Sequence, residues 1–91
     1  MNLSNRIQDL NYNLLKLSSW VETNIKDAFS AVEKKDLELS KTVINTDSKI
    51  NMMEVEIEKE VNDILETFHP SNNDLRYLLA ALKINNELER I

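Results

Sequence analysis

The sequence contains no glycine, no cysteine and a single proline, and only 5% of its 91 residues are aromatic. Without glycine the chain can form neither the glycine-rich loops that bind phosphates and dinucleotides nor a glycine-based β-hairpin turn. Without cysteine it can form neither a disulfide framework nor a thiolate metal site. The longest apolar run, Tyr77–Leu82, is far shorter than the roughly 20 residues that cross a bilayer. We therefore expect a soluble, cytoplasmic chain without direct membrane insertion.

The charge of the chain is negative and unevenly distributed. Its formal net charge is −5, from 11 basic and 16 acidic side chains. A nucleic-acid-binding module needs a basic face that neutralises phosphates, so we do not expect nucleic acid as a partner. Residues 54–66 carry six acidic side chains and one basic one, which matches the net charge of the whole chain. The interpretation is a solvated helix face, with a cation-binding patch as the alternative.

Two long stretches, about residues 3–33 and 36–68, place apolar residues at intervals of three and four. This spacing is typical of helices that pack side by side, and each stretch contains one additional four-residue step, a stutter. The first seam consists of Leu3, Ile7, Leu10, Leu14, Leu17, Val21, Ile25, Ala28 and Val32. The second consists of Leu39, Val43, Thr46, Ile50, Met53, Ile57, Val61, Ile64 and Phe68. Because only Lys34 and Lys35 precede a potential N-cap at Asp36, the two helices are expected to form an antiparallel hairpin.

A third helix is predicted over residues 72–91. His69 precedes the only proline, Pro70, which ends the second helix, and Ser71 can cap the third. The overall prediction is an all-α, antiparallel three-helix bundle with two long helices and a shorter third.

The third helix is apolar around most of its circumference, in two stripes. The first stripe consists of Leu75, Leu78, Leu79 and Leu82, and the second of Tyr77, Ala81, Ile84, Leu88 and Ile91. Two neighbouring helices cannot cover both stripes, so we expect a patch containing Leu78, Leu82 and Ile84 to stay exposed. The expected consequence is a homo-oligomer, most simply a two-fold dimer.

Isolated motifs give little support for catalysis. Glu66 and His69 have the Glu-x-x-His spacing of di-metal centres, but such a centre needs a second copy and His69 is the only histidine. A carboxylate-bridged di-metal oxidase is therefore the least favoured function, and we do not expect an enzyme. Trp20 lies beside the first seam, where packing at the edge of the core or against a partner is expected.

The second and third helices carry motifs that resemble the PhoU family of phosphate-transport regulators. Pro70, Asp74, Leu75 and Arg76 match the family's Pro-x-x-x-Asp-Leu-Arg opening of the third helix. Leu88, Glu89, Arg90 and Ile91 match the Leu-Glu-Arg-Ile of its ending, with Glu87 in place of the usual Asp. On the second helix Val43, Ile44, Asp47, Ile50, Asn51, Glu54, Ile57 and Glu58 fall on the family pattern. The resemblance covers about residues 9–91.

The resemblance implies one three-helix repeat of a cytoplasmic protein that normally has two. It implies a negative regulator that links a phosphate ABC transporter ATPase to the sensor histidine kinase of the phosphate-starvation response. Such proteins act by contact, and some longer members bind iron or zinc through acidic helix motifs. The alternative is a helical oligomerisation module with no metal or phosphate role.

The same resemblance singles out four carboxylates. Glu89 matches the first carboxylate of the family's acidic motif, whose following Gly-Asp pair is missing here. Asp47, Glu54 and Glu58 match positions on the second helix that can be structural instead. We expect an amino-terminal fragment of a longer regulator, in which metal binding is weak or absent.

Overall fold

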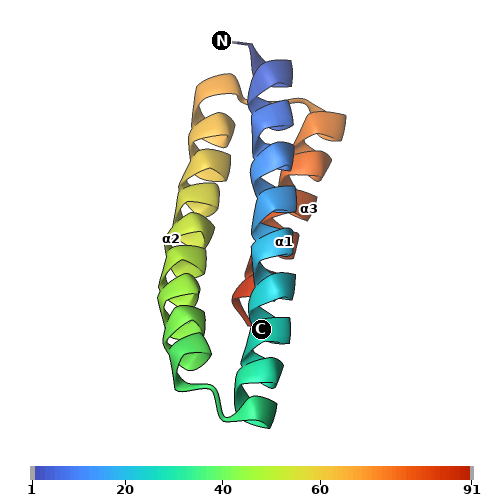
Figure 1. The fold of residues 1–91 in the computed structure, drawn as a ribbon. Helices are drawn as coiled ribbons and strands as arrows, with labels where there is room; N and C mark the ends of the chain where they lie inside the picture. The colour runs from blue at the N-terminus through green and yellow to red at the C-terminus, as the bar shows by residue number, and fades with distance from the viewer. Residues whose placement is uncertain (1, 91) are drawn as a thin grey trace.

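The computed structural model describes residues 2–90, and all regular secondary structure in that part of the chain is helical. The helices are α1 (Leu3–Lys34), α2 (Leu37–Phe68) and α3 (Asn72–Glu89). α1 and α2 form an antiparallel hairpin, and α3 returns along it (Figure 1). The molecule measures 51 × 18 × 17 Å. The predicted all-α three-helix bundle is confirmed.

The connection between α1 and α2 is as tight as the sequence predicts. Lys35 adopts the left-handed helical conformation, with φ of 52°, and ends α1. The Asp36 N–H then donates to the Ala31 carbonyl over 3.0 Å, which satisfies one of the free acceptors at the helix end. The Asp36 carboxylate accepts from the Leu39 N–H over 3.1 Å. The predicted N-cap at Asp36 is therefore confirmed.

α2 ends at Phe68, as predicted, whereas the ends of α3 differ in detail from the prediction. His69 closes α2 in the left-handed conformation, with φ of 45°. Ser71 occupies the N-cap position of α3, but its side chain makes no capping hydrogen bond. α3 ends at Glu89 with Arg90 still in right-handed helical geometry, whereas the prediction extended it to Ile91, which lies outside the described residues.

The core lies where three helices meet. Its buried members come from both seams and from α3: Leu10, Leu14, Leu17, Val21, Ile50, Ile57, Val61, Ile64, Leu78 and Ala81. We call residues 3–21 and 54–89 the covered half, because there α3 lies against the hairpin. Residues 22–53, around the α1–α2 turn, form the open half, which extends beyond the end of α3 (Figure 1).

Six predicted seam residues near the α1–α2 turn are not part of the core: Ile25, Ala28 and Val32 of α1 and Leu39, Val43 and Thr46 of α2. The side chains of Ile25 and Val32 are 36% and 79% exposed, although both follow the spacing of their buried neighbours. The physical reason is length: within residues 2–90, α3 has 18 residues and α1 has 32, so α3 lies over the covered half alone. Ala31 and Ile50 are the only apolar residues of that half, residues 22–53, whose side chains are buried.

The apolar patch predicted on α3 has the wrong members. Leu78 is fully buried and Leu82 is partly buried against the core, whereas Ile84 is 48% exposed. The helix turns Leu78, Ala81 and Asn85 inward, at spacings of three and four residues, so that the core stripe combines members of both predicted stripes. Tyr77 and Leu79 remain about half exposed.

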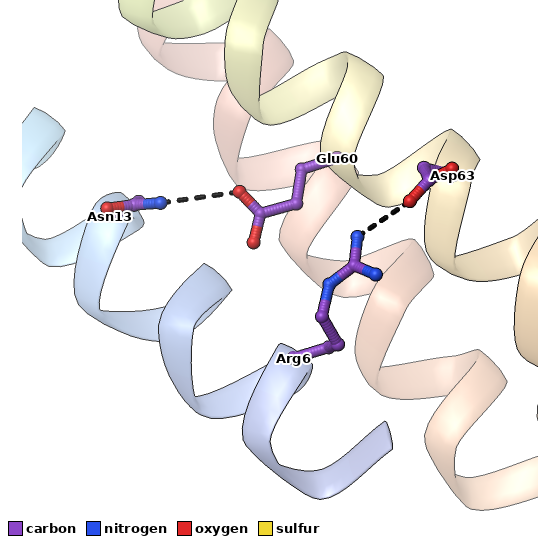
Figure 2. Close-up of polar contacts among 4 residues, drawn as sticks. All are labelled: Arg6, Asn13, Glu60 and Asp63. Atoms are coloured by element: carbon purple, nitrogen blue, oxygen red, sulfur yellow. Dashed lines mark hydrogen bonds and ion pairs between the residues drawn. The ribbon is translucent and has the colours of Figure 1, made fainter. Parts of the chain in front are cut away.

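Polar contacts hold α1 against α2 in the covered half. The Arg6 guanidinium donates to the Asp63 carboxylate over 2.8 Å, and the Asn13 amide donates to the Glu60 carboxylate over 3.3 Å (Figure 2). The Arg6 guanidinium also lies 5.9 Å from the centre of the Phe68 ring. These contacts fix the register of the hairpin at the end away from the turn.

Candidate functional site

A pocket lies at the boundary between the covered and open halves, where α3 ends. It has a volume of about 330 Å³ and is lined by all three helices. Its apolar lining consists of Val21, Ile25, Ala28, Val43, Ile44, Ile50 and Leu88. Its polar lining consists of Asn24, Asp47, Asn51, Glu54 and Glu89. Three carboxylates and two side-chain amides therefore line a pocket whose remaining lining is apolar.

Helical spacing explains how the acidic residues come together. Asp47, Asn51 and Glu54 are separated by four and three residues, which places them on one face of α2. Glu89 is the last helical residue of α3 and approaches the same face from the third helix. Three of the four carboxylates that the sequence singled out thus share one pocket.

Glu54 is the most unusual of the three. Its side chain is only 2% exposed, and its Oε2 atom has no hydrogen-bond partner. Beside it, the Asn85 side-chain amide donates to the Glu54 backbone carbonyl over 3.0 Å, while the Asn85 Oδ1 atom also lacks a partner. These two residues, which are joined by one hydrogen bond, therefore each carry a buried acceptor atom without a donor. Such orphan groups are rare in protein interiors and cost stability.

The surroundings of Glu54 disfavour its ionised form. Burial raises the pKa of the Glu54 carboxyl, and the negative charges of Glu89 and Asp47 raise that pKa further. Each additional cation brought to the pocket would relieve this repulsion, whereas each additional anion would strengthen it.

Asn85 was not predicted as a functional residue from the sequence. Its position seven residues after Leu78 places it on the buried stripe of α3, where a polar side chain needs a partner. The seven-residue spacing from Leu78 to Asn85 is the feature of the sequence that could have predicted this burial. It can be used only once the inward face of α3 is known.

Glu58 does not belong to the pocket. It lies on α2 but is exposed and does not line the cavity with Asp47 and Glu54. Glu66 and His69 are exposed as well. Within residues 2–90, no group of three His, Cys, Asp or Glu side chains is placed to hold a metal ion. The roles of Asp47, Glu54, Glu58 and Glu89 as metal ligands stay a prediction.

The acidic window of residues 54–66 is only partly a solvated face. Glu56, Glu58 and Glu66 are exposed, as interpreted from the sequence. Glu54 is buried and Glu60 is half-buried against Asn13. Burial raises the pKa of the Glu60 carboxyl, although the Asn13 hydrogen bond and the Arg6 charge act in the opposite direction.

Trp20 contributes to packing at the edge of the core, as predicted. It is partly buried against the core cluster, and the Lys16 ammonium lies 5.0 Å from the centre of its ring. It also lines a shallow polar hollow between α1 and α2.

Comparison with known proteins places the chain in a family. The family model described as the PhoU domain matches residues 14–91. The phosphate-specific transport system accessory protein PhoU of Serratia marcescens is 36% identical over 85 residues, covering 93% of this chain and 35% of that protein. Its namesake in Escherichia coli K12 is 33% identical over 85 residues, with the same coverage. No solved structure matches the chain significantly.

A more distant bacterium shows the same likeness over the whole chain. The PhoU homologue of Aquifex aeolicus is 30% identical over 91 residues, covering 100% of this chain and 41% of that protein. The chain thus spans between about a third and two fifths of the length of these relatives. Among the helices of residues 2–90, none combines the length and apolarity that a bilayer crossing requires. The match of the PhoU domain over most of the sequence confirms the resemblance, and the chain belongs to the PhoU family.

Proposed function

We propose that this chain is a regulatory module of phosphate uptake and phosphate-starvation signalling that works in the cytoplasm. The observation that carries the proposal is the PhoU-domain match over residues 14–91, together with relatives named as accessory proteins of a phosphate-specific transport system. The proposed partners are a phosphate ABC transporter ATPase and a sensor histidine kinase. The module acts as a negative regulator, by contact and without catalysis.

The shape of the molecule supports a role in docking. Two 32-residue helices present long, regular faces to solvent, and several large apolar side chains on them are exposed. The exposed members include Phe29 at 73%, Ile44 at 66% and Met52 at 70%. Apolar side chains on a rigid helical face are typical of protein-protein contacts. If the chain binds one state of the transporter or kinase more tightly than another, it shifts the equilibrium of that partner toward the bound state.

The regulatory role can be tested by complementation. The chain would be expressed in a bacterial strain that lacks its own PhoU protein and carries a phosphate-starvation reporter. We expect the derepressed reporter signal in phosphate-rich medium to fall several-fold. The variant Leu17→Asp, which places a charge in the core, serves as the unfolded control. A folded chain that leaves the reporter fully derepressed would contradict the proposal.

The two partners can be tested separately. Purified chain would be immobilised and exposed in turn to the transporter ATPase subunit and to the cytoplasmic part of the sensor kinase. Binding to one partner alone would narrow the proposal to that partner. Binding to neither would contradict docking as the mechanism.

The first candidate metal ligand is Glu89, and Asp47, Glu54 and Glu58 are the weaker candidates. Tight binding of iron or zinc needs several convergent oxygen or nitrogen ligands, and the described residues do not provide such a set. We therefore expect weak or undetectable heat in calorimetric titrations with ferric or zinc ions. A tight, stoichiometric isotherm that Glu89→Ala abolishes would contradict this expectation.

The second candidate function is a helical oligomerisation module, without metal or phosphate. The favouring observation is the exposed outer side of α3, where Ala80, Ile84 and Leu88 line an apolar hollow. A homodimer is compatible with both candidate functions. Light scattering coupled to size exclusion tests it: a mass near 10.6 kDa at tens of micromolar would rule out self-association.

A further inference from the structure

α3 carries two neighbouring stripes of residues, and the bundle buries the less apolar of the two. The inward stripe consists of Leu78, Leu82 and Asn85, at intervals of four and three residues. Leu78 and Asn85 are fully buried, and Leu82 is partly buried against the core. The adjacent stripe runs one residue earlier at the same intervals and consists of Tyr77, Ala81, Ile84 and Leu88. Apolar burial alone would therefore select the adjacent stripe as the inward face.

The adjacent stripe already lies at the edge of the groove that α3 occupies. Ala81, which borders both stripes, is buried, and Leu88 is partly buried against the core. The larger side chains of Tyr77 and Ile84 remain 46% and 48% exposed. Successive residues of an α-helix are separated by about 100° around its axis. A rotation of α3 by no more than that angle would therefore turn the whole adjacent stripe into the groove.

Asn85 weakens the observed position of α3. Its side-chain amide donates to the Glu54 backbone carbonyl over 3.0 Å, but its Oδ1 atom and the Glu54 Oε2 atom are buried without a partner. A buried polar atom that lacks a hydrogen bond costs stability. The inward stripe thus buries two leucines together with a polar residue that is only half satisfied.

Few polar contacts oppose a rotation of α3. Within residues 2–90, the bond from Asn85 to Glu54 is the only hydrogen bond or ion pair that joins α3 to the hairpin. α1 and α2, by contrast, are joined by three side-chain hydrogen bonds in the same part of the chain. At its beginning, α3 follows Ser71, whose side chain makes no capping hydrogen bond. α3 can therefore turn about its axis with the loss of a single polar contact.

We infer that α3 is a two-position helix, which turns about its axis to exchange the inward stripe for the adjacent stripe in the groove of the covered half. Asn85 sets the balance between the two positions, because it is the one polar member of the inward stripe. In the second position Tyr77 and Ile84 are buried, whereas Leu78 and Asn85 turn toward water. Small shifts of one packed helix against another are a known form of protein switch.

The rotation couples α3 to the pocket at its end. Leu88 and Glu89 both line that pocket, and Glu89 lies four residues after Asn85, on the stripe that turns away. In the second position the Glu89 carboxylate therefore moves away from Glu54. Any ligand that binds one arrangement of the pocket more tightly shifts the position of α3 as well. The inference concerns the 91-residue chain itself and does not rest on the proposed regulatory function.

The exposure of Tyr77 reports the position of α3. The chain has two tyrosines, so Tyr12→Phe leaves Tyr77 as the only one and fluorotyrosine then gives a single fluorine NMR signal. Line broadening by a soluble paramagnetic agent measures how exposed that ring is. Circular dichroism at 222 nm measures helix content, and light scattering verifies that the mass of the particle stays constant, so that burial by self-association is recognised.

Two substitutions at Asn85 should move the helix in opposite directions. Asn85→Asp places a charge on the inward stripe beside the Glu54 carboxylate, so α3 should adopt the second position. We expect the broadening of the Tyr77 signal to fall by about half, with helix content unchanged. Asn85→Leu makes the inward stripe wholly apolar, and the Tyr77 ring should stay as exposed as in the parent chain or become more exposed.

A control distinguishes rotation of α3 from its detachment. Ile84→Lys changes an exposed side chain in the observed position and should alter neither the Tyr77 signal nor the helix content. Combined with Asn85→Asp, it leaves α3 without an apolar stripe to bury. In this double variant α3 should detach, so that helix content falls and the Tyr77 ring becomes more exposed than in the parent chain.

Two results for Asn85→Asp would overturn the inference. A Tyr77 ring as exposed as in the parent chain, with full helix content, would show that α3 stays in its observed position despite the buried charge. A fall in helix content to the level of the double variant would show that α3 detaches and has no second position. A less exposed ring at unchanged helix content and unchanged mass supports it.

Discussion

The covered and open halves of the hairpin are built from the same pattern of apolar residues but bury it differently. In the covered half, Leu10, Leu17, Ile57, Val61 and Ile64 are fully or almost fully excluded from solvent. In the open half, the seam residues Val32 and Ile25 are 79% and 36% exposed. The difference comes from α3 and not from the spacing of the apolar residues. Two helices alone bury only part of their apolar faces, and in the covered half α3 closes the core. Spacing therefore identifies the inward face, whereas burial depends on how far α3 reaches.

The largest expected effect is a difference between two identical truncations on α2. Ile57→Ala removes a fully buried side chain and should lower the free energy of unfolding by about 2–5 kcal/mol. Ile44→Ala removes a side chain that is 66% exposed and should cost no more than about 0.5 kcal/mol. Urea denaturation followed by circular dichroism at 222 nm, at a concentration where the chain is monomeric, measures both. Equal losses would show that the open half is closed in solution.

The parts of the fold that depend on local signals were predictable from the sequence, whereas the parts that depend on the packing of α3 were not. The hairpin, the Asp36 cap and the end of α2 before Pro70 follow from local signals, which act within a few residues. The inward face of α3 does not, because that helix is apolar on most sides and only its packing on α1 and α2 selects Leu78 and Asn85. For the same reason the burial of Glu54 was missed although its place on α2 was identified.

The second prediction concerns the boundary between the halves. Glu54→Gln removes a buried negative charge from the neighbourhood of Asp47 and Glu89 and replaces a carboxylate whose Oε2 atom has no partner with an amide that can also donate. At pH 7 we expect the free energy of unfolding to rise by about 1 kcal/mol. Thermal denaturation should show a melting temperature a few degrees higher in the variant. Glu58→Gln, at an exposed position outside the pocket, is the matched control and should change little.

The same carboxyl gives a pH dependence of known sign. The pKa of Glu54 is raised in the folded chain, so between the unfolded and folded pKa values the folded state binds more protons. This contribution to stability should therefore be complete below the unfolded pKa and should be lost as the pH rises through that window to above the folded pKa. Glu60, whose pKa is also raised, contributes in the same direction. Glu54→Gln should flatten the profile, and a wild-type chain that loses stability steadily from pH 7 to pH 5 would contradict this assignment.

The third prediction concerns the turn of the open half. Lys35 occupies a left-handed conformation that disfavours side chains with a Cβ atom, with φ of 52°. Lys35→Gly should therefore stabilise the monomer by about 0.5–1 kcal/mol. The control Lys26→Gly, within α1, should instead destabilise it by a similar amount. A loss of stability in both variants would indicate that Lys35 contributes through its side chain and not through its backbone.

The smallest expected effect concerns the polar contacts of the covered half. The Arg6–Asp63 ion pair is 2.8 Å long, but the Asp63 side chain is 59% exposed, so solvent screens much of its energy. Asp63→Asn should lower the free energy of unfolding by about 0.5 kcal/mol or less at low salt. The loss should shrink further at ~1 M salt, where exposed charges are screened within about 3 Å. Because the Arg6 guanidinium also lies near the Phe68 ring, Arg6→Ala should cost more than Asp63→Asn, and part of that loss should persist in high salt. Equal and fully salt-sensitive losses in the two variants would mean that Arg6 acts only through the ion pair and that its contact with the Phe68 ring contributes nothing measurable.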